Sequence, residues 1–180
     1  RPVEVELGCA DAEFLFARCA AEPGRTYVGV EIRQELVDRV NDQATSQGLT
    51  QLQAVYANLN HDLERLFAPG QVDLCHINFP DPCFKSQHKK RRFLTPELVR
   101  GLAAVIPPGA TLAFQSDVFD IALDSLAILE ESHPLFINEL GPWTFARSHD
   151  YGARSKRERR CEDDGVRIWR FRFRRGDSLP

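Results

Sequence analysis

The stretch FPDPCFKSQHKKRRF, residues 79–93, places one acid beside a dense group of cations. Asp81 stands between Pro80 and Pro82, whose rings restrict the backbone and hold the acid in a turn. Basic or imidazole side chains then follow at Lys85, His88, Lys89, Lys90, Arg91 and Arg92. A carboxylate suits a small polar ligand, whereas a run of cations suits a polyanion. The stretch therefore predicts two ligands, or one ligand that has both characters.

Two further acids have the spacing of a nucleoside site. Glu6 opens the turn Glu6-Leu7-Gly8-Cys9-Ala10-Asp11-Ala12, which has one glycine where nucleotide-binding turns have several. By itself this turn reads as a plain strand–helix connection. Glu31 follows about 20 residues later, where an acid commonly accepts hydrogen bonds from ribose hydroxyls, although a surface carboxylate is the alternative. Together the two acids favour a nucleoside pocket.

Composition excludes several classes of protein. The five cysteines have no CxxC spacing, so neither a disulfide framework nor a zinc site is expected, and reduced thiols in the cytoplasm are the simpler interpretation. No stretch approaches the roughly 18 to 20 uncharged apolar residues of a membrane span, and no secretory leader is visible. The first residues already belong to a strand-like run, which is compatible with a missing N-terminal extension.

Charge is unevenly distributed along the 180 residues. Residues 1–83 contain 13 acids and 6 bases, whereas 84–180 contain 13 acids and 17 bases, clustered at 85–92, 147–160 and 167–175. Such clusters attract phosphate-bearing partners through counterion release. An ordinary solvated face is the alternative interpretation.

The elements that must position these residues alternate between short β-rich runs and helical ones. Strands are expected at 3–7, 27–32, 52–56, 72–78, 110–115, 135–140 and 166–174. Helices are expected at 12–21, 34–47, 62–67 and 118–132, and a further one begins at the cap Thr95 and ends before Pro107. A polar, arginine-rich loop of about 25 residues is expected between the last two strands.

This order predicts an α/β fold, with a mostly parallel seven-stranded sheet, helices on both faces and a hairpin-like antiparallel edge. In the last strand, phenylalanines alternate with Arg170, Arg172 and Arg174, which either extend a nucleic-acid surface or protect an edge strand. Ligands of such sheets bind at the carboxyl ends of the strands. We therefore expect five segments to be neighbours: Gly8–Ala12, Glu31, Asn58, Asn78–Asp81 and Ser116-Asp117.

These segments form an ordered series that resembles the tRNA (guanine-N7-)-methyltransferase family, whose members are class I S-adenosylmethionine-dependent enzymes with a Rossmann-like fold. The series is Val5-Glu6-Leu7-Gly8, Tyr27–Ile32, Gly48–Leu52, Asn78–Pro82 with His88–Arg92, and Ser116-Asp117. The resemblance runs nearly end to end, so one methyltransferase domain over 1–180 is expected. Its most specific element is Asn78–Pro82 followed by Lys85 and the cationic run.

The resemblance implies a role for each matching residue. Asp81 and Asp117 would be the catalytic acids at the target guanine. S-adenosyl-L-methionine would be held by Glu6, Gly8, Glu31, Asn58 and Asn78, with Gly8 under its methionine part and Glu31 on its ribose. The tRNA would be bound by Lys85, His88, Lys89, Lys90, Arg91, Arg92, Asp117, Ser155, Lys156 and Glu158. The implied product is 7-methylguanosine in the variable loop, at position 46.

Several positions depart from the family pattern. Ala10 and Ala12 replace loop glycines, Asn58 replaces an aspartate that faces adenine, and Arg157 replaces an aromatic residue. Weakened cofactor binding follows, so a weak or inactive tRNA-binding homologue is the alternative function. A dinucleotide-dependent oxidoreductase is a third hypothesis, which the absence of GxGxxG opposes. We expect no membrane or metal partner, and a monomer or a weak homodimer.

Overall fold

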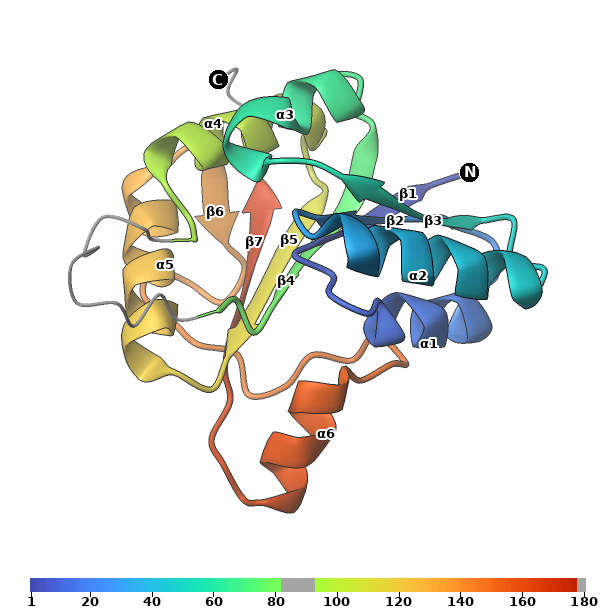
Figure 1. Ribbon diagram of the computed structural model, residues 1–180. Coiled ribbons are helices and arrows are strands. Elements are labelled where there is room, and N and C mark those ends of the chain that lie inside the picture. Colours follow the sequence, from blue (N-terminus) through green and yellow to red (C-terminus); the bar gives the residue numbers. More distant parts are fainter. Residues whose placement is uncertain (82–92, 178–180) are drawn as a thin grey trace.

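The computed structural model describes residues 1–81 and 93–177 (Figure 1). The cationic run from Lys85 to Arg92 therefore lies outside the described residues. The described residues form a seven-stranded sheet in the order β3-β2-β1-β4-β5-β7-β6. Its strands are β1 (Val3–Leu7), β2 (Thr26–Glu31), β3 (Leu52–Tyr56), β4 (Val72–Asn78), β5 (Thr111–Ser116), β6 (Phe136–Asn138) and β7 (Trp169–Arg175).

Strands β1 to β5 are parallel, and β7 runs antiparallel to both β5 and β6. The predicted α/β fold with an antiparallel β6–β7 pair is thus confirmed. The prediction that the last strand is an edge strand is wrong, because β7 lies between β5 and β6. β6 pairs with Phe173–Arg175 of β7 and forms the edge of the sheet there, while Phe171 and Phe173 are buried in the large core.

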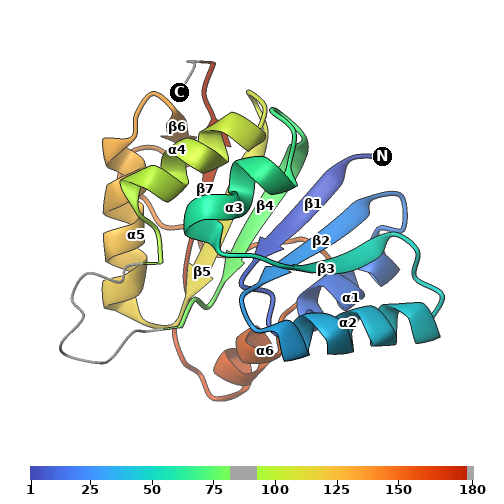
Figure 2. The same cartoon turned by 45° about the horizontal axis from the view of Figure 1, so that its top comes forward.

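Helices cover the two faces of the sheet unequally (Figures 1 and 2). The helices are α1 (Glu13–Ala21), α2 (Gln34–Ser46), α3 (Leu59–Leu66), α4 (Pro96–Val105), α5 (Phe119–Glu131) and α6 (Lys156–Asp163). Helices α3, α4 and α5 pack on one face, in a core that includes Leu63, Leu102, Leu126 and the strand residues Leu7 and Ile77. Helices α1 and α2 pack on the other face in a smaller cluster.

Strand alternation makes that other face partly polar. Leu7 and Ile77 point into the large core, whereas their neighbours Glu6 and His76 are also buried, on the opposite side. A charged cluster lies there between β1, β4 and α1. Arg18 donates to both oxygens of Glu4, at 2.7 and 2.9 Å, and Nε2 of His76 lies 2.9 Å from Glu4 Oε1. These buried groups are acceptable because each charge has a partner.

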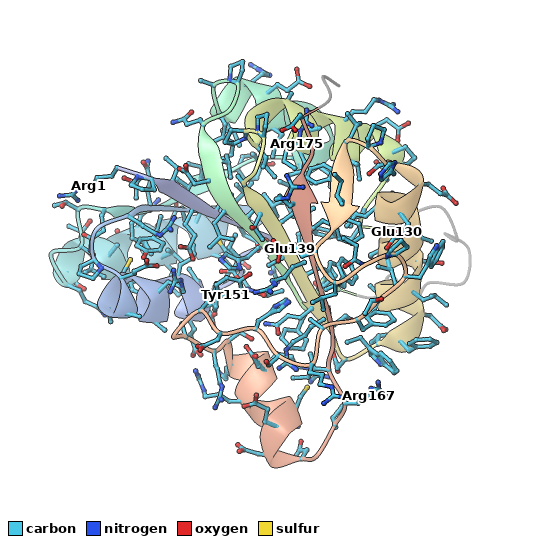
Figure 3. All side chains as sticks on the ribbon, turned by 180° about the vertical axis from the view of Figure 1, so that it is seen from behind. Arg1, Glu130, Glu139, Tyr151, Arg167 and Arg175 are labelled. Atoms are coloured by element: carbon cyan, nitrogen blue, oxygen red, sulfur yellow. The ribbon has the colours of Figure 1, made fainter. Side chains whose placement is uncertain are left out.

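The chain between β6 and α6 crosses this polar face, and Glu139 and Tyr151 mark its course in Figure 3. Ala146 forms a bridge to Arg170, and the Tyr151 ring meets His76 edge-on at 4.8 Å. The backbone oxygen of Tyr151 accepts a hydrogen bond from Arg18. The segment 139–155 therefore connects β6 with α6 and positions α6 at the carboxyl edge of the sheet.

Helix α6 corrects the prediction of an uninterrupted loop. Ser155 is its N-cap, and the Ser155 hydroxyl accepts a hydrogen bond from the backbone N–H of Glu158 at 3.1 Å. Ser-x-x-Glu is the capping-box pattern, so this signal was present in the sequence. The density of arginines concealed it, because α6 has almost no apolar stripe and buries only Glu158 and Cys161.

Candidate functional site

Parallel pairing brings the ends of β1 to β5 to one edge of the sheet. The backbone N–H of Gly8 donates to Val30 at 2.8 Å, and that of Ala57 donates to Glu31 at 3.0 Å. On the other side of β1, Asn78 is joined to Glu6 through their side chains at 2.8 Å. The predicted strand-end segments are therefore neighbours, as the topological rule requires.

The turn after β1 keeps a left-handed backbone although two of its expected glycines are alanines. Gly8, Ala10 and Ala12 have φ angles of 75°, 49° and 54°. A left-handed alanine costs about 1 kcal/mol relative to an unstrained one. Hydrogen bonds fix the turn against this cost, since Ala10 N–H donates to Glu31 Oε2 at 2.9 Å and Ala12 N–H to Cys9 O at 2.7 Å. The alanines retain the form of the turn.

Glu31 is a buried carboxylate with a dense set of donors. Its Oε1 accepts from the backbone N–H groups of Ile32 and Arg33 at 3.0 and 3.1 Å. The Arg33 guanidinium donates to both oxygens, at 2.9 and 3.1 Å. Burial acts to raise the pKa of Glu31, but the hydrogen bonds from Arg33 and Ala10 outweigh it and lower that pKa. Arg33 therefore occupies the oxygens that ribose hydroxyls would need.

The Arg33 side chain can move away from Glu31 into solvent, because half of it is exposed. The Glu31 side chain is only 4% exposed. The hydrogen bond to Glu31 raises the pKa of Arg33, and the charge of Asp81 adds to that effect. Asp81 thus lies within electrostatic range of Arg33. Arg33 was not predicted as a site residue, and its position two residues after a strand-end acid is the only signal for it in the sequence.

Glu6 is the buried acid with a spare acceptor. Its side chain is 4% exposed, Oε1 accepts from Asn78 Nδ2, and Oε2 has no hydrogen-bond partner among the described residues. Burial raises the pKa of Glu6 to about 8. A buried oxygen without a partner is costly, and a ligand donor at this place removes that cost.

A chain of buried amides and charges connects Glu6 with α6. Gln115 Nε2 donates to Asn78 Oδ1 at 3.0 Å and to Glu158 Oε2 at 3.1 Å. Arg170 completes the chain by donating to Gln115 Oε1 at 3.1 Å and to Glu158 Oε1 at 2.8 Å. We call Glu6, Asn78, Gln115, Glu158 and Arg170 the polar relay. Asn78 thus contacts Glu6, another predicted cofactor residue. Glu158 connects the first turn of α6 with the strands through Gln115 and Arg170.

Gln115 and Arg170 were not predicted as site residues. The signal available was a polar side chain at a buried position of a strand, Gln115 within Leu-Ala-Phe-Gln-Ser. Such residues are hydrogen-bonded when buried, so each implies a partner. The identity of that partner depends on strand order, which brings β5 between β4 and β7.

Asp81 follows an unusual backbone conformation. Phe79 has a φ of 49°, which is rare for an aromatic residue, and its N–H donates to Gln115 O at 2.8 Å. Pro80 is buried, whereas Asp81 is exposed. Left-handed non-glycine residues concentrate at ligand sites, where the surroundings compensate for the strain. The turn directs Asp81 out of the sheet edge instead of into the core.

Asp117, the second predicted acid, is paired with α6. Arg157 Nη2 donates to Asp117 Oδ2, and this hydrogen bond and charge raise the pKa of Arg157. Arg157 stands where the resemblance leads one to expect an aromatic residue. Its side chain is 52% exposed, so the ion pair is a surface contact that solvent and ligands can replace.

The other predicted tRNA residues near α6 divide into two groups. Ser155 and Glu158 have structural contacts, because one caps the helix and the other belongs to the polar relay. Lys156 is exposed and has no ion pair within residues 1–81 and 93–177. The remaining cations of this region pair with surface acids: Arg154 with Glu162, Arg159 with Glu13 and Arg160 with Asp164.

Asn58 lies at the carboxyl end of β3, next to the end of β2. Its backbone N–H donates to Asp62 Oδ2 at 2.9 Å, and its carbonyl accepts from Asp62 N–H at 3.0 Å. This reciprocal pair begins α3 and fixes the backbone on the adenine side of the predicted pocket.

The site has the character of a nucleoside site with exposed cations beside it. Two buried acids, Glu6 and Glu31, face the turn after β1, and two more acids, Asp81 and Asp117, lie at the ends of β4 and β5. Within the described residues, no group of three or more His, Cys, Asp or Glu side chains is arranged to hold a metal ion. Among the same residues no helix has the length and apolarity to cross a membrane.

Comparison with known proteins gives consistent matches. A family model described as "Putative methyltransferase" matches residues 1–171. The tRNA (guanine-N(7)-)-methyltransferase of Synechococcus sp. (strain JA-3-3Ab) is 37% identical over 172 residues, covering 95% of this chain and 71% of that protein. The tRNA (guanine-N(7)-)-methyltransferase of Synechococcus sp. (strain CC9311) is 34% identical over 183 residues, covering 99% and 77%.

One solved structure shows how widely the fold is shared. Geranyl diphosphate C-methyltransferase from Streptomyces coelicolor A3(2), in complex with Mg2+, geranyl diphosphate and S-adenosyl-L-homocysteine, has a TM-score of 0.64 at 11% identity. The superposition covers 97% of this chain and 73% of that one. At this identity the likeness concerns the fold alone, and it confirms the predicted Rossmann-like methyltransferase architecture.

Proposed function

The chain belongs to the tRNA (guanine-N7-)-methyltransferase family, and from that membership we propose that it transfers a methyl group from S-adenosylmethionine to N7 of a guanine in tRNA. One observation carries the proposal: four acids, Glu6, Glu31, Asp81 and Asp117, gather at the carboxyl edge of one sheet. This is the edge where such sheets bind nucleosides.

The residues at the end of β1 and β2 fit the cofactor. Glu31 would accept hydrogen bonds from the ribose hydroxyls of the cofactor once Arg33 releases the Glu31 carboxylate. Asn58 would lie on the adenine side. Oε2 of Glu6, which has no partner among the described residues, suits the ammonium group of the methionine part, whose positive charge would favour the ionised carboxylate. At Gly8 the Phe93 ring lies 3.7 Å from the place of a Cβ, so that ring borders the space that the methionine part would occupy. The bound cofactor supplies an electrophilic methyl group on a sulfonium.

The chain's own contribution is to select and orient the base. Guanine N7 has a lone pair and carries no proton, so no general base is needed. Asp81 would accept from guanine N1–H and the 2-amino group, a pair of donors that no other base presents. Asp117 is the alternative acceptor for the same edge, once Arg157 moves away. Both acids also stabilise the positive charge of the methylated purine.

The cationic run and the exposed Lys156 would neutralise tRNA phosphates around the target. We place the target in the variable loop, at position 46, because a loop base is accessible without opening an A-form helix. We place the reaction in the cytoplasm, where tRNA is found.

A second function, tRNA binding without methyl transfer, is favoured by one observation. Arg33 and Arg157 occupy the carboxylates of Glu31 and Asp117, so cofactor and base must each displace an arginine. If these pairs are too stable, the protein binds tRNA through its cations without turning over.

Titration calorimetry with S-adenosylmethionine, followed by transfer of labelled methyl to an unmodified tRNA transcript, tests the proposal. We expect micromolar binding and one 7-methylguanosine in the variable loop, located by mass spectrometry of nuclease fragments. Binding of tRNA without uptake of the cofactor would establish the second function instead. A modified guanosine outside the variable loop would refute only the proposed position.

A further inference from the structure

An aromatic ladder runs from the centre of the large core to the carboxyl edge of the sheet. Phe114 and Phe171, both fully buried, stack with ring centroids 4.6 Å apart and planes 2° apart. Phe145 connects Phe171 with Trp169, at centroid distances of 6.2 and 5.1 Å. Phe119 is the last member, 4.5 Å from Trp169. The inner part of the ladder is ordinary core packing.

The outer end of the ladder lies beside the proposed guanine site. Trp169 is the cross-strand partner of Ser116, and Asp117 follows Ser116 directly. Phe119 stands two residues after Asp117, at the start of α5. Arg167, just before β7, marks the same corner in Figure 3. The outer rings and the second predicted acid are therefore parts of one surface.

This end of the ladder is not sealed by other apolar groups. Phe119 is 42% exposed, whereas Phe114 and Phe171 are completely buried. The guanidinium carbon of Arg167 lies 3.8 Å from the centroid of the Trp169 ring, in a stacked cation–π contact. Arg167 is exposed and pairs with no carboxylate in the part of the chain that the structure describes. A flat apolar surface and an unneutralised cation thus occur together.

A nucleotide combines the two complementary features. Its base offers a flat π-face for the exposed ring of Phe119, which Trp169 supports from behind at 4.5 Å. Its phosphate offers a charge for Arg167, which covers the Trp169 ring. Residues 147–167 contain seven bases and five acids, so the neighbourhood has a small excess of positive charge. Helix α6, which carries most of these bases, reaches the same corner through the contact between Arg157 and Asp117.

We propose that Phe119, Trp169 and Arg167 form a stacking site for a tRNA nucleotide that flanks the target guanine. The site rests on the proposed function, since it takes its nucleotide from the tRNA whose guanine Asp81 and Asp117 would hold. It is separate from the cofactor pocket, which lies beyond β4 at the ends of β1 and β2. Its task is to position the RNA, so it acts on tRNA affinity and not on cofactor affinity.

The test compares Phe119→Ala with Leu123→Ala. Leu123 is a matched control because it is 39% exposed and lies one turn further along the same face of α5. We expect Phe119→Ala to raise the KM for tRNA and the Kd for tRNA about tenfold, with kcat and cofactor affinity within twofold of wild type. Phe119→Tyr should restore both values, and thermal unfolding checks that each variant is folded.

Salt dependence distinguishes stacking from charge. Loss of the Phe119 ring should leave the slope of log Kd against log salt unchanged. Arg167→Ala should reduce that slope by about the amount that one phosphate contact contributes. Arg167→Lys keeps the charge but loses the planar stack, so it should keep the slope and still weaken binding.

Direct tRNA binding separates this inference from the proposed function. If wild-type protein binds tRNA without methylating it and Phe119→Ala weakens that binding, the stacking site stands and the proposed function fails. If Phe119→Ala binds tRNA as tightly as Leu123→Ala does, the stacking site is refuted whatever the activity. A concentration-dependent dimer that only Phe119→Ala abolishes would assign this surface to a second copy and likewise overturn the inference.

Discussion

At the scale of residues, the four acids of the candidate site differ in burial and in the partners that they already have. Glu31 and Asp117 are paired with the half-exposed arginines Arg33 and Arg157. Glu6 is buried, with one oxygen that has no partner among residues 1–81 and 93–177, and Asp81 is exposed. On the proposed function, ligand binding would replace protein hydrogen bonds at Glu31 and Asp117 and would add new ones at Glu6 and Asp81.

Asp81 carries the first residue-scale prediction. Asp81→Ala should reduce methyl transfer at least a hundredfold, because the variant can no longer accept from the guanine edge, while the Kd for S-adenosylmethionine stays within a few fold. Transfer to a tRNA transcript and titration calorimetry measure the two quantities. Asp120→Ala, another exposed acid at this edge, is the control. Full activity of Asp81→Ala would remove that acid from the mechanism.

Arg33 carries the second prediction. Arg33→Ala should tighten binding of S-adenosylmethionine by up to about fivefold, which corresponds to the ~1 kcal/mol that a half-exposed ion pair contributes. The reason is that the cofactor then has no guanidinium to displace from Glu31. Arg39→Ala is the control, because Arg39 is an exposed arginine of α2 that lies away from Glu31. Weaker binding by Arg33→Ala would show that Arg33 contacts the cofactor itself.

At the scale of elements, the two faces of the sheet have different tasks. One face packs against α4 and α5 and forms the large hydrophobic core. The other face carries the polar relay and the cluster of Glu4, Arg18 and His76. The relay connects β1, β4, β5 and β7 with α6 through neighbouring side chains. Helix α6 has little apolar area to bury, so these polar contacts hold it at the sheet edge.

The pair formed by Glu158 and Arg170 tests that role. Arg170→Met leaves a buried carboxylate without its charge partner and should destabilise the protein by about 3–5 kcal/mol in urea unfolding. Adding Glu158→Gln should recover much of this loss, because no buried charge remains. Arg172→Met is the control from the same strand, where the ion pair with Glu139 is about one-third exposed. Additive losses in the double variant would mean that the two residues are not coupled.

At the scale of the whole molecule, segment 139–155 closes the polar face and brings α6 to the site. His149 belongs to this segment, and burial, together with the charges of His76, Arg170 and Arg172, lowers the pKa of His149 to about 3. The folded state therefore binds fewer protons than the unfolded state between pH 6.5 and pH 3. Stability from this group is present above that window and is lost as the pH falls through it.

His149→Asn should remove this contribution. The difference in the free energy of unfolding between wild type and variant should be largest at pH 7 and should shrink when the pH falls to 5. Comparing the two proteins isolates His149 from Glu6, whose raised pKa of about 8 gives the opposite slope. Glu4, with a pKa lowered to about 2, loses its contribution only below about pH 4.5. A difference that does not change with pH would place His149 in a solvated setting.

The sequence by itself determined the local and periodic features. Apolar alternation predicted β3 and β4 to the residue, and strand–helix order predicted a parallel sheet with Glu31, Asn58, Asp81 and Asp117 at one edge. These features follow from side-chain periodicity and from the geometry of parallel sheets, and both can be derived from residues close together along the chain. The family resemblance had the same basis, in short motifs at fixed spacing.

Only the tertiary structure decided the partners. It placed β7 inside the sheet, turned a predicted loop into α6, and joined Gln115 and Arg170 to Glu158. It also assigned Arg33 to Glu31 and Arg157 to Asp117, so that two acids predicted to bind ligands are already occupied by the protein. Most of these contacts join residues far apart in the chain. A charged side chain has many possible partners in a sequence, and packing selects one.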